Sequence, residues 1–271
     1  MPVQPRDRAH GSGHVVALLR GYAALMRTNL RSSMALRVAF VMQSVFMALN
    51  NALFFVIWWV LFERFEEIRG WRLDDFAALY GIAAAGYGLS VIFAGGVPDL
   101  AQRIEDGDLD AMLTLPQSVL VQAAAATTRP AGWGDLVSGI ALIALGGHLS
   151  AWVILAAVLS AVTFTASGVV LHSAGFWVRR METLSRQAQE FVLAFSLYPP
   201  SLFGSTLKLF LFTVIPAGFA SYLPAEIIRA PTAITVASAV VGTLLYAVFA
   251  TWLFARGLRQ YASGNRFGVR Q

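Results

Sequence analysis

The sequence predicts an all-α integral membrane protein with six transmembrane helices, and three observations lead to that prediction. Of the 271 residues, 57% are hydrophobic and 13% are charged, whereas a soluble chain carries roughly 25% charged residues. The apolar residues form uninterrupted blocks, and a block of about 20 such residues is long enough to span a bilayer. The basic residues gather at the ends of these blocks, as they do in the cytoplasmic loops of membrane proteins.

The six predicted spans belong to a single transmembrane domain over residues 1–271. They cover approximately residues 38–61, 76–95, 133–148, 152–178, 187–203 and 232–255. The third span is short and begins beside Asp135, and the fourth stops at Arg179 and Arg180. A basic amphipathic helix is predicted before the first span, over residues 14–35, because Arg20, Arg27 and Arg31 share one side of it. We expect this helix to lie in the headgroup layer of the membrane.

The segment between residues 186 and 228 permits two interpretations. It is too long for one span and too short for two spans with loops, and Pro199 and Pro200 divide it. In the first interpretation, residues 187–203 form the fifth span and residues 205–228 form a re-entrant region on the outer side. In the second, residues 207–222 are the span, and residues 181–198 lie on the membrane surface.

The distribution of basic residues predicts the orientation. With both termini on one side, fifteen of the 20 lysine and arginine residues fall on that side and five on the other. Cytoplasmic loops carry the excess of positive charge. The N- and C-termini are therefore expected in the cytoplasm. The arginines do not form the polar, aromatic-interleaved face that nucleic-acid binding requires, so no nucleic-acid partner is expected.

Several kinds of chemistry are excluded by the residues that are missing. A phosphate-binding loop needs a lysine after its glycines, and the only lysine, Lys208, lies between two leucines. Any nucleotide is therefore handled by another chain. The sequence has no cysteine and no metal-ligand spacing, so no metal site and no catalytic residue are predicted. His172, inside the fourth span, is expected to be a neutral imidazole hydrogen-bonded to a neighbouring helix.

Gradient-driven transport needs carboxylates inside the membrane. Asp135 and Glu190 are predicted near span ends, so the energy is expected to come from outside the bilayer. A gradient-driven secondary transporter or channel remains the alternative, and an intramembrane enzyme is less favoured because the spans contain few convergent polar residues.

The loop over residues 96–116 is the most informative segment. It combines five acidic residues with apolar ones, and it is predicted to fold as a short helix, a break at Gly107 and a second helix. Leu109, Met112 and Leu113 are expected to form an apolar face that a partner protein covers. An ordinary solvated loop is the alternative.

Several short motifs, in order along the chain, resemble the ABC-2 type permeases, the membrane subunits of bacterial ATP-binding-cassette exporters. They are Gly70-Trp71, Gly107-Asp108-Leu109-Asp110, Leu115-Pro116, Gly134-Asp135, Leu197-Tyr198-Pro199, Ile215-Pro216 and Tyr222-Leu223-Pro224. The resemblance covers nearly the whole chain. The sequence departs from the family at Leu115, where members often carry arginine before the proline.

The resemblance implies a permease, not an enzyme, located in the bacterial inner or plasma membrane. Two permeases, identical or different, would pair with separate ATPase subunits that bind ATP and magnesium, while this chain binds no cofactor. The coupling region would comprise Arg103, Ile104, Glu105, Asp106, Gly107, Asp108, Leu109, Asp110, Met112 and Leu113. A secondary contact would involve Arg180, Met181 and Leu184. The re-entrant region and outer gate would include Tyr198, Pro199, Pro216, Tyr222 and Pro224.

Overall fold

The structure is a computed structural model that describes residues 11–213 and 215–261, and every named element in these ranges is helical. The long helices are α1 (Gly11–Ser33), α2 (Arg37–Arg64), α3 (Leu73–Phe93), α7 (Ala131–Leu145), α8 (Trp152–His172), α9 (Met181–Ser196) and α12 (Ala233–Leu258). The shorter ones are α4 (Leu100–Asp106), α5 (Leu109–Leu113), α6 (Val119–Ala125), α10 (Ser205–Thr213) and α11 (Leu223–Arg229). Four single turns complete the order: η1 (Val97–Asp99), η2 (Ser173–Phe176), η3 (Pro200–Leu202) and the π-helical η4 (Gly218–Tyr222).

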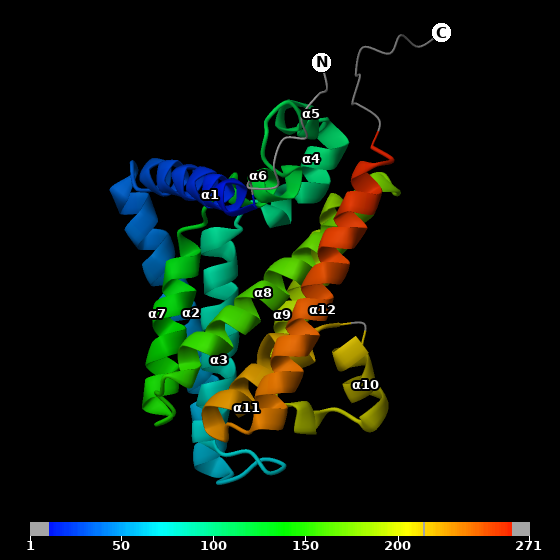
Figure 1. Cartoon of the computed structure of the whole chain (residues 1–271). Helices are drawn as coiled ribbons and strands as arrows, with labels where there is room; N and C mark the ends of the chain where they lie inside the picture. Colours follow the sequence, from blue (N-terminus) through cyan, green and yellow to red (C-terminus); the bar gives the residue numbers. More distant parts are fainter. Residues whose placement is uncertain (1–10, 214, 262–271) are drawn as a thin grey trace, which may run out of the picture.

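Within the described residues, four helices are long and apolar enough to cross a membrane: α2, α3, α8 continued by η2, and α12. They coincide closely with predicted spans one, two, four and six. Helix α7 is equally apolar but has 15 residues, and it lies within the bundle beside α2 and α3 (Figure 1). The predicted class, a multi-pass helical membrane protein, is therefore confirmed.

The segment that permitted two interpretations contains several short elements. Helix α9 begins at Met181, earlier than the predicted fifth span, and ends at Ser196, before the Pro199-Pro200 pair. Residues 207–222 do not form one continuous helix, because α10 ends at Thr213 and η4 begins at Gly218. A proline in this position supplies no backbone donor and clashes with the preceding turn, which accounts for the interruption at Pro216.

Helix α3 occupies the centre of the bundle, and small residues allow it to approach α7 closely. A Cβ atom added to Gly81 would lie 2.7 Å from the Gly139 carbonyl oxygen, and one added to Gly88 would lie 2.6 Å from the Gly132 carbonyl oxygen. Real Cβ atoms do not approach oxygen this closely, so all four positions depend on glycine. Small residues of this kind are how membrane helices pack backbone against backbone.

The short elements gather at the two ends of the bundle. Helices α4, α5 and α6 lie together at one end, with α1 across it, and we call this the α5 end (Figure 1). Helices α10 and α11 and the turn between α2 and α3 lie at the other, the α11 end. Here Arg229 makes an ion pair with Asp75 at 2.6 Å and lies 4.7 Å from the centre of the Trp71 ring.

Candidate functional site

The candidate coupling region at the α5 end has the local structure that the sequence predicts. Helix α4 ends at Asp106, Gly107 adopts a left-handed conformation with φ of +81°, and α5 follows from Leu109. The Asp108 amide donates to the Arg103 carbonyl at 3.0 Å, closing the turn. Glycine is favoured there because it tolerates positive φ without a steric penalty. The prediction of a helix, a break and a second helix is confirmed.

The prediction for the apolar face of this region is wrong at Leu109. Its side chain is fully buried in the chain's own core, together with Ile104 and Val119. Helix α5 has only five residues, which is too short to form separate inward and outward apolar faces. Its first residue, Leu109, packs inward, directly after the Gly107 turn. Met112 is half-buried against the same core, whereas Leu113 is 51% exposed.

The exposed apolar residues of this region lie further along the chain than the sequence indicates. Leu113 and Leu115 are 51% and 55% exposed, and Pro116 beside them is also exposed. Around them lie exposed acidic and small residues: Glu105, Asp106, Asp108, Ala111 and Thr114. We call Leu113, Leu115 and Pro116 with this acidic rim the α5 apex. Its chemistry suits a protein surface that offers an apolar pocket bordered by positive charge.

The structure brings the predicted secondary contact against the coupling region. The Met181 amide, at the start of α9, donates to Glu105 Oε1 at 2.7 Å. Asp99, just before α4, accepts from Arg186 of α9 at 3.0 Å and from Arg129 at 2.9 Å. Arg180 precedes α9 in a left-handed conformation, and Leu184 is 60% exposed. The segment from Asp99 to Glu105 and helix α9, distant in sequence, are therefore joined by two contacts to carboxylates.

The predicted outer-gate residues lie toward the α11 end, around the last turn of α9. Tyr198 makes edge contacts with the rings of Phe54 and Trp58 on α2. Tyr222 donates its hydroxyl hydrogen to the Phe195 carbonyl at 2.7 Å. The remaining members, Pro199, Pro216 and Pro224, are buried. The two tyrosines therefore fasten the same helix end to α2 on one side and to η4 on the other.

A polar cluster inside the bundle was missed by the sequence reasoning. Asn51, at the middle of α2, donates to Asp135 Oδ1 and to Ser138 Oγ, each at 2.8 Å, and accepts from the Tyr80 hydroxyl at 2.9 Å. Asn51 and Asp135 are 6% and 4% exposed. Asp135 thus packs against the midpoint of a long apolar helix, deeper than its predicted position near a span end. The pair Asn50-Asn51 inside that apolar helix was the available signal, because polar residues within spans mark functional sites.

His172 is fully buried, and its Nε2 lies 3.2 Å from Gln189 Oε1 on α9. The predicted hydrogen bond to a neighbouring helix is confirmed. Glu190 is exposed and lies outside the polar cluster.

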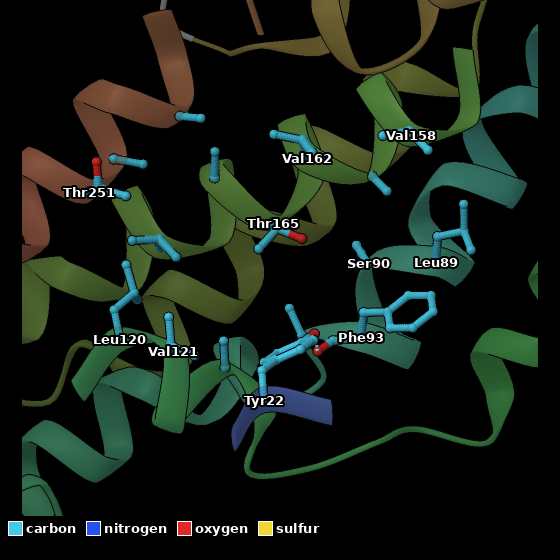
Figure 2. Close-up of a pocket in the computed structure, with 17 residues that line it drawn as sticks. Tyr22, Leu89, Ser90, Phe93, Leu120, Val121, Val158, Val162, Thr165 and Thr251 are labelled. Atoms are coloured by element: carbon cyan, nitrogen blue, oxygen red, sulfur yellow. Dashed lines mark hydrogen bonds between the residues drawn. The ribbon is translucent and has the colours of Figure 1, made fainter. Parts of the chain in front are cut away.

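A cavity of about 570 Å³ lies between α1, α3, α6, α8 and α12 (Figure 2). Tyr22 of α1 reaches across it and donates to the Phe93 carbonyl at 2.7 Å, and burial raises the pKa of this phenol, which keeps the hydrogen in place. Apolar side chains such as Leu120, Val158 and Val162 line most of it, and none of its described lining residues is charged. Such a surface can hold an acyl chain, and its few polar groups are the hydroxyls of Tyr22, Ser90, Thr165 and Thr251.

Among the residues that the structure describes, no three histidine, aspartate or glutamate side chains are grouped so that they could hold a metal ion. The polar side chains of the bundle instead bond to one another, as in the Asn51–Asp135 cluster and the His172–Gln189 pair.

Comparison with known families matches residues 48–264 to the family described as ABC-2 family transporter protein. The match includes α3 to α12, both ends of the bundle and the Asn51–Asp135 cluster. No curated protein and no solved structure matches the chain. Because the match covers well over half of the 271 residues, the chain belongs to the ABC-2 family of transporter proteins.

Proposed function

We propose that this chain is the permease subunit of a bacterial ATP-binding-cassette exporter, which works as a pair of permeases driven by separate ATPase subunits. The observation that carries the proposal is the α5 apex: exposed Leu113, Leu115 and Pro116 with an acidic rim, in the segment that follows the Gly107 turn. The ATPase would bind ATP and magnesium. The apex would lie on the cytoplasmic side of the inner membrane, where both chain termini are also proposed.

Six spans are proposed, with α9 as the fifth. Its first residue, Met181, contacts Glu105 at the α5 end, and Tyr198, just after its last turn, packs against Trp58 in the outer half of α2. These contacts support a helix that crosses the bundle rather than one that lies on the membrane surface. Helix α7, although short, would serve as the third span.

Residues 205–228 are proposed as the re-entrant region on the outer side. Arg229, directly after it, pairs with Asp75 in the first turn of α3, which keeps α11 at that end of the bundle. Helix α1, which lies across the α5 end (Figure 1), is proposed as the interfacial helix, with Arg20 and Arg27 among its exposed residues.

A second permease is proposed to cover one of the two exposed apolar faces. Helices α2 and α12 each have only 17% of their most apolar stretch buried. Leu53 on α2 and Leu245 on α12 are 68% and 66% exposed. Lipid suits both faces chemically, and one of them is available for the partner.

Transport would follow from movement of the ATPases. Closure of the ATPase pair on ATP would displace the α5 apex, and the contacts of Glu105 with Met181 and of Asp99 with Arg186 would carry that displacement to α9. ATP then shifts the permease between inward-open and outward-open states, because the ATPase binds the two states with different affinity.

The test is co-purification of the proposed ATPase subunit with the tagged permease when the two are expressed together. Leu113→Arg places a charge where an apolar contact is proposed, and we expect the co-purified ATPase to fall at least about tenfold. Leu149→Arg is the matched control, because Leu149 is 63% exposed in the turn between α7 and α8 at the opposite end. It should retain the ATPase fully. Full retention by both Leu113→Arg and Leu115→Arg would show that the α5 apex is not the contact.

A further inference from the structure

One oxygen of the buried Asp135 carboxylate has no hydrogen-bond partner. Oδ1 accepts from Asn51, whereas Oδ2 is buried without a donor. An ionised carboxylate accepts hydrogen bonds on both oxygens, and a buried acceptor left unmet costs free energy. Such an atom is therefore a position where a missing donor would be stabilised, and Asp135 is among the residues that line a cavity.

The surrounding cluster has no hydrogen left to give. Asn51 uses both amide hydrogens, on Asp135 and on Ser138. Tyr80 uses its single hydroxyl hydrogen on Asn51, and Ser138 uses its own on the Asp135 carbonyl at 3.2 Å. What the cluster presents is a preorganised acceptor that carries a negative charge, so its complement is a donor with a positive charge.

Asp135 lines a cavity of about 310 Å³ between α2, α3, α7 and α9. Aromatic side chains form part of its wall, from Phe54, Tyr80 and Tyr87, and the rest is largely apolar, for example Met47 and Leu193. None of the described residues that line it is positively charged. The combination of one carboxylate with aromatic walls favours an organic cation, because ring faces attract cations and apolar walls favour an apolar body.

We propose that this cavity binds an amphipathic organic cation, with its ammonium group donating to Asp135 Oδ2 and its apolar body against the aromatic wall. The inference rests on the proposed function, in which such a molecule is the class of substrate that the permease carries. A metal ion fits less well, because hard cations take six or more oxygen ligands, and a single free carboxylate oxygen is present here. An anionic ligand would face an uncompensated carboxylate.

The experiment measures binding of two matched probes to the full chain in nanodiscs by titration calorimetry. 4-Phenylbutylamine carries an ammonium group at pH 7, and 4-phenylbutanol has almost the same shape and donates a hydrogen bond without charge. We expect the amine to bind at least about tenfold more tightly than the alcohol, because charge-assisted hydrogen bonds exceed neutral ones by this order.

Asp135→Asn keeps the size of the side chain and removes the charge, so it should weaken amine binding about tenfold and leave alcohol binding within about twofold. Glu67→Gln is the control, an exposed carboxylate on the turn between α2 and α3 that should change neither. Equal amine binding by the wild-type chain and Asp135→Asn would overturn the inference. So would equal binding of the two probes by the wild-type chain, the result expected if Asp135 simply holds a proton.

Monodisperse elution of Asp135→Asn, with alcohol binding retained, shows that the variant is folded. If it does not fold, Tyr87→Leu replaces it: loss of one ring from the cavity wall should weaken amine binding twofold to fivefold, because the ring face attracts the cation and an aliphatic side chain does not, and unchanged amine binding would overturn the site. The outcome is separate from that of the ATPase experiment. A chain that retains its ATPase but binds both probes equally leaves the proposed function standing without this site.

Discussion

Helices α2 and α3 are consecutive and both apolar, yet they are built for opposite surroundings. In the most apolar stretch of α3, 83% of the residues are buried, against 17% in α2. Eight of the 21 residues of α3 are alanine or glycine, whereas α2 has three alanines and no glycine among 28. Large side chains therefore face outward and small ones form the centre, the reverse of a soluble core, because lipid accepts bulky apolar groups and close helix packing does not.

The comparison also explains how an exposed helix stays attached. Helix α2 has three buried residues, Asn51, Trp58 and Phe62. Trp58 stacks on Phe76 of α3 with ring centres 4.4 Å apart, and Asn51 holds Asp135 of α7. Backbone packing of Gly134 against Ser44 and Ala48 adds to these contacts, and the exposed face of α2 is left for lipid or for the proposed second permease.

The largest expected effect comes from filling the contact between α3 and α7. Gly139→Leu would force its side chain into the Gly81 carbonyl and the Ala85 backbone, so we expect a loss of about 3 kcal/mol or more and little folded protein. Size-exclusion elution and thermal unfolding measure it. Gly204→Leu is the control, because a Cβ there meets no atom within 4 Å. Equal behaviour of the two variants would contradict the close packing.

A smaller loss is expected when the polar attachment of α2 is removed. Asn51→Ala leaves the buried Asp135 carboxylate without its donor, which should cost about 2 to 3 kcal/mol. Asn50→Ala, on the exposed neighbour, should cost under about 0.5 kcal/mol. A thermal shift of equal size for both would show that α2 is not held at Asn51. If the double variant Asn51→Ala, Asp135→Ala is more stable than Asn51→Ala alone, the stability loss is assigned to the hydrogen bond between these two residues.

The first turn of α3 supplies a closely matched pair of carboxylates. Asp75 is the partner of Arg229, with both side chains mostly shielded, whereas Asp74 lies 3.8 Å from an exposed Arg72. We expect Asp75→Asn to lower stability by about 1 to 2 kcal/mol and Asp74→Asn by less than about 0.5, because exposed ion pairs contribute little. Thermal unfolding at low and high salt measures both. If Asp74→Asn proved the more damaging, α11 would not be fastened through Arg229.

The smallest effect is expected on the outer face of α2. Leu53→Ala removes a side chain that is 68% exposed, so thermal stability of the single chain should change by under about 0.5 kcal/mol. Leu79→Ala, at a fully buried position of α3, should cost about 2 kcal/mol or more. Cross-linking of the assembled transporter adds a second readout. Loss of permease pairing in Leu53→Ala alone would place the partner on α2.

Much of the fold could be predicted from the sequence, because lipid imposes a simple rule on length and polarity. The first and last spans were expected at 38–61 and 232–255; helix α2 includes the first, and helix α12 includes all of the last except residue 232. The Gly107 break was also predictable, since it depends on one residue type and its neighbours. Helix α9 was harder, because Arg186 and Gln189 interrupt its apolar pattern, and their partners Asp99 and His172 come from elsewhere in the fold.

The candidate sites were less predictable because they depend on contacts between distant segments. Asn51 and Asp135 are 84 positions apart, and nothing near either residue in the sequence indicates the other. Leu109 has an ordinary amphipathic environment in the sequence, and only the packing of α4 and α6 around it decides that it is buried. Because Leu109 is buried, the exposed apolar residues of the α5 apex are Leu113 and Leu115.

Two contacts, from Glu105 of α4 and from Asp99 just before it, make α9 move together with α4 as one rigid unit. Glu105 holds the backbone of Met181, and Asp99 holds the side chain of Arg186 more than one turn further on, so the start of α9 cannot pivot independently of α4. From Met181 to Leu193 a helix extends about 18 Å, and a rotation of about 10° at its start would sweep Leu193 through about 3 Å. Leu193 lies in the wall of the cavity that contains Asp135. A small rotation of α4 at one end of the molecule would therefore change the width of the cavity beside Asp135, near the middle of α2.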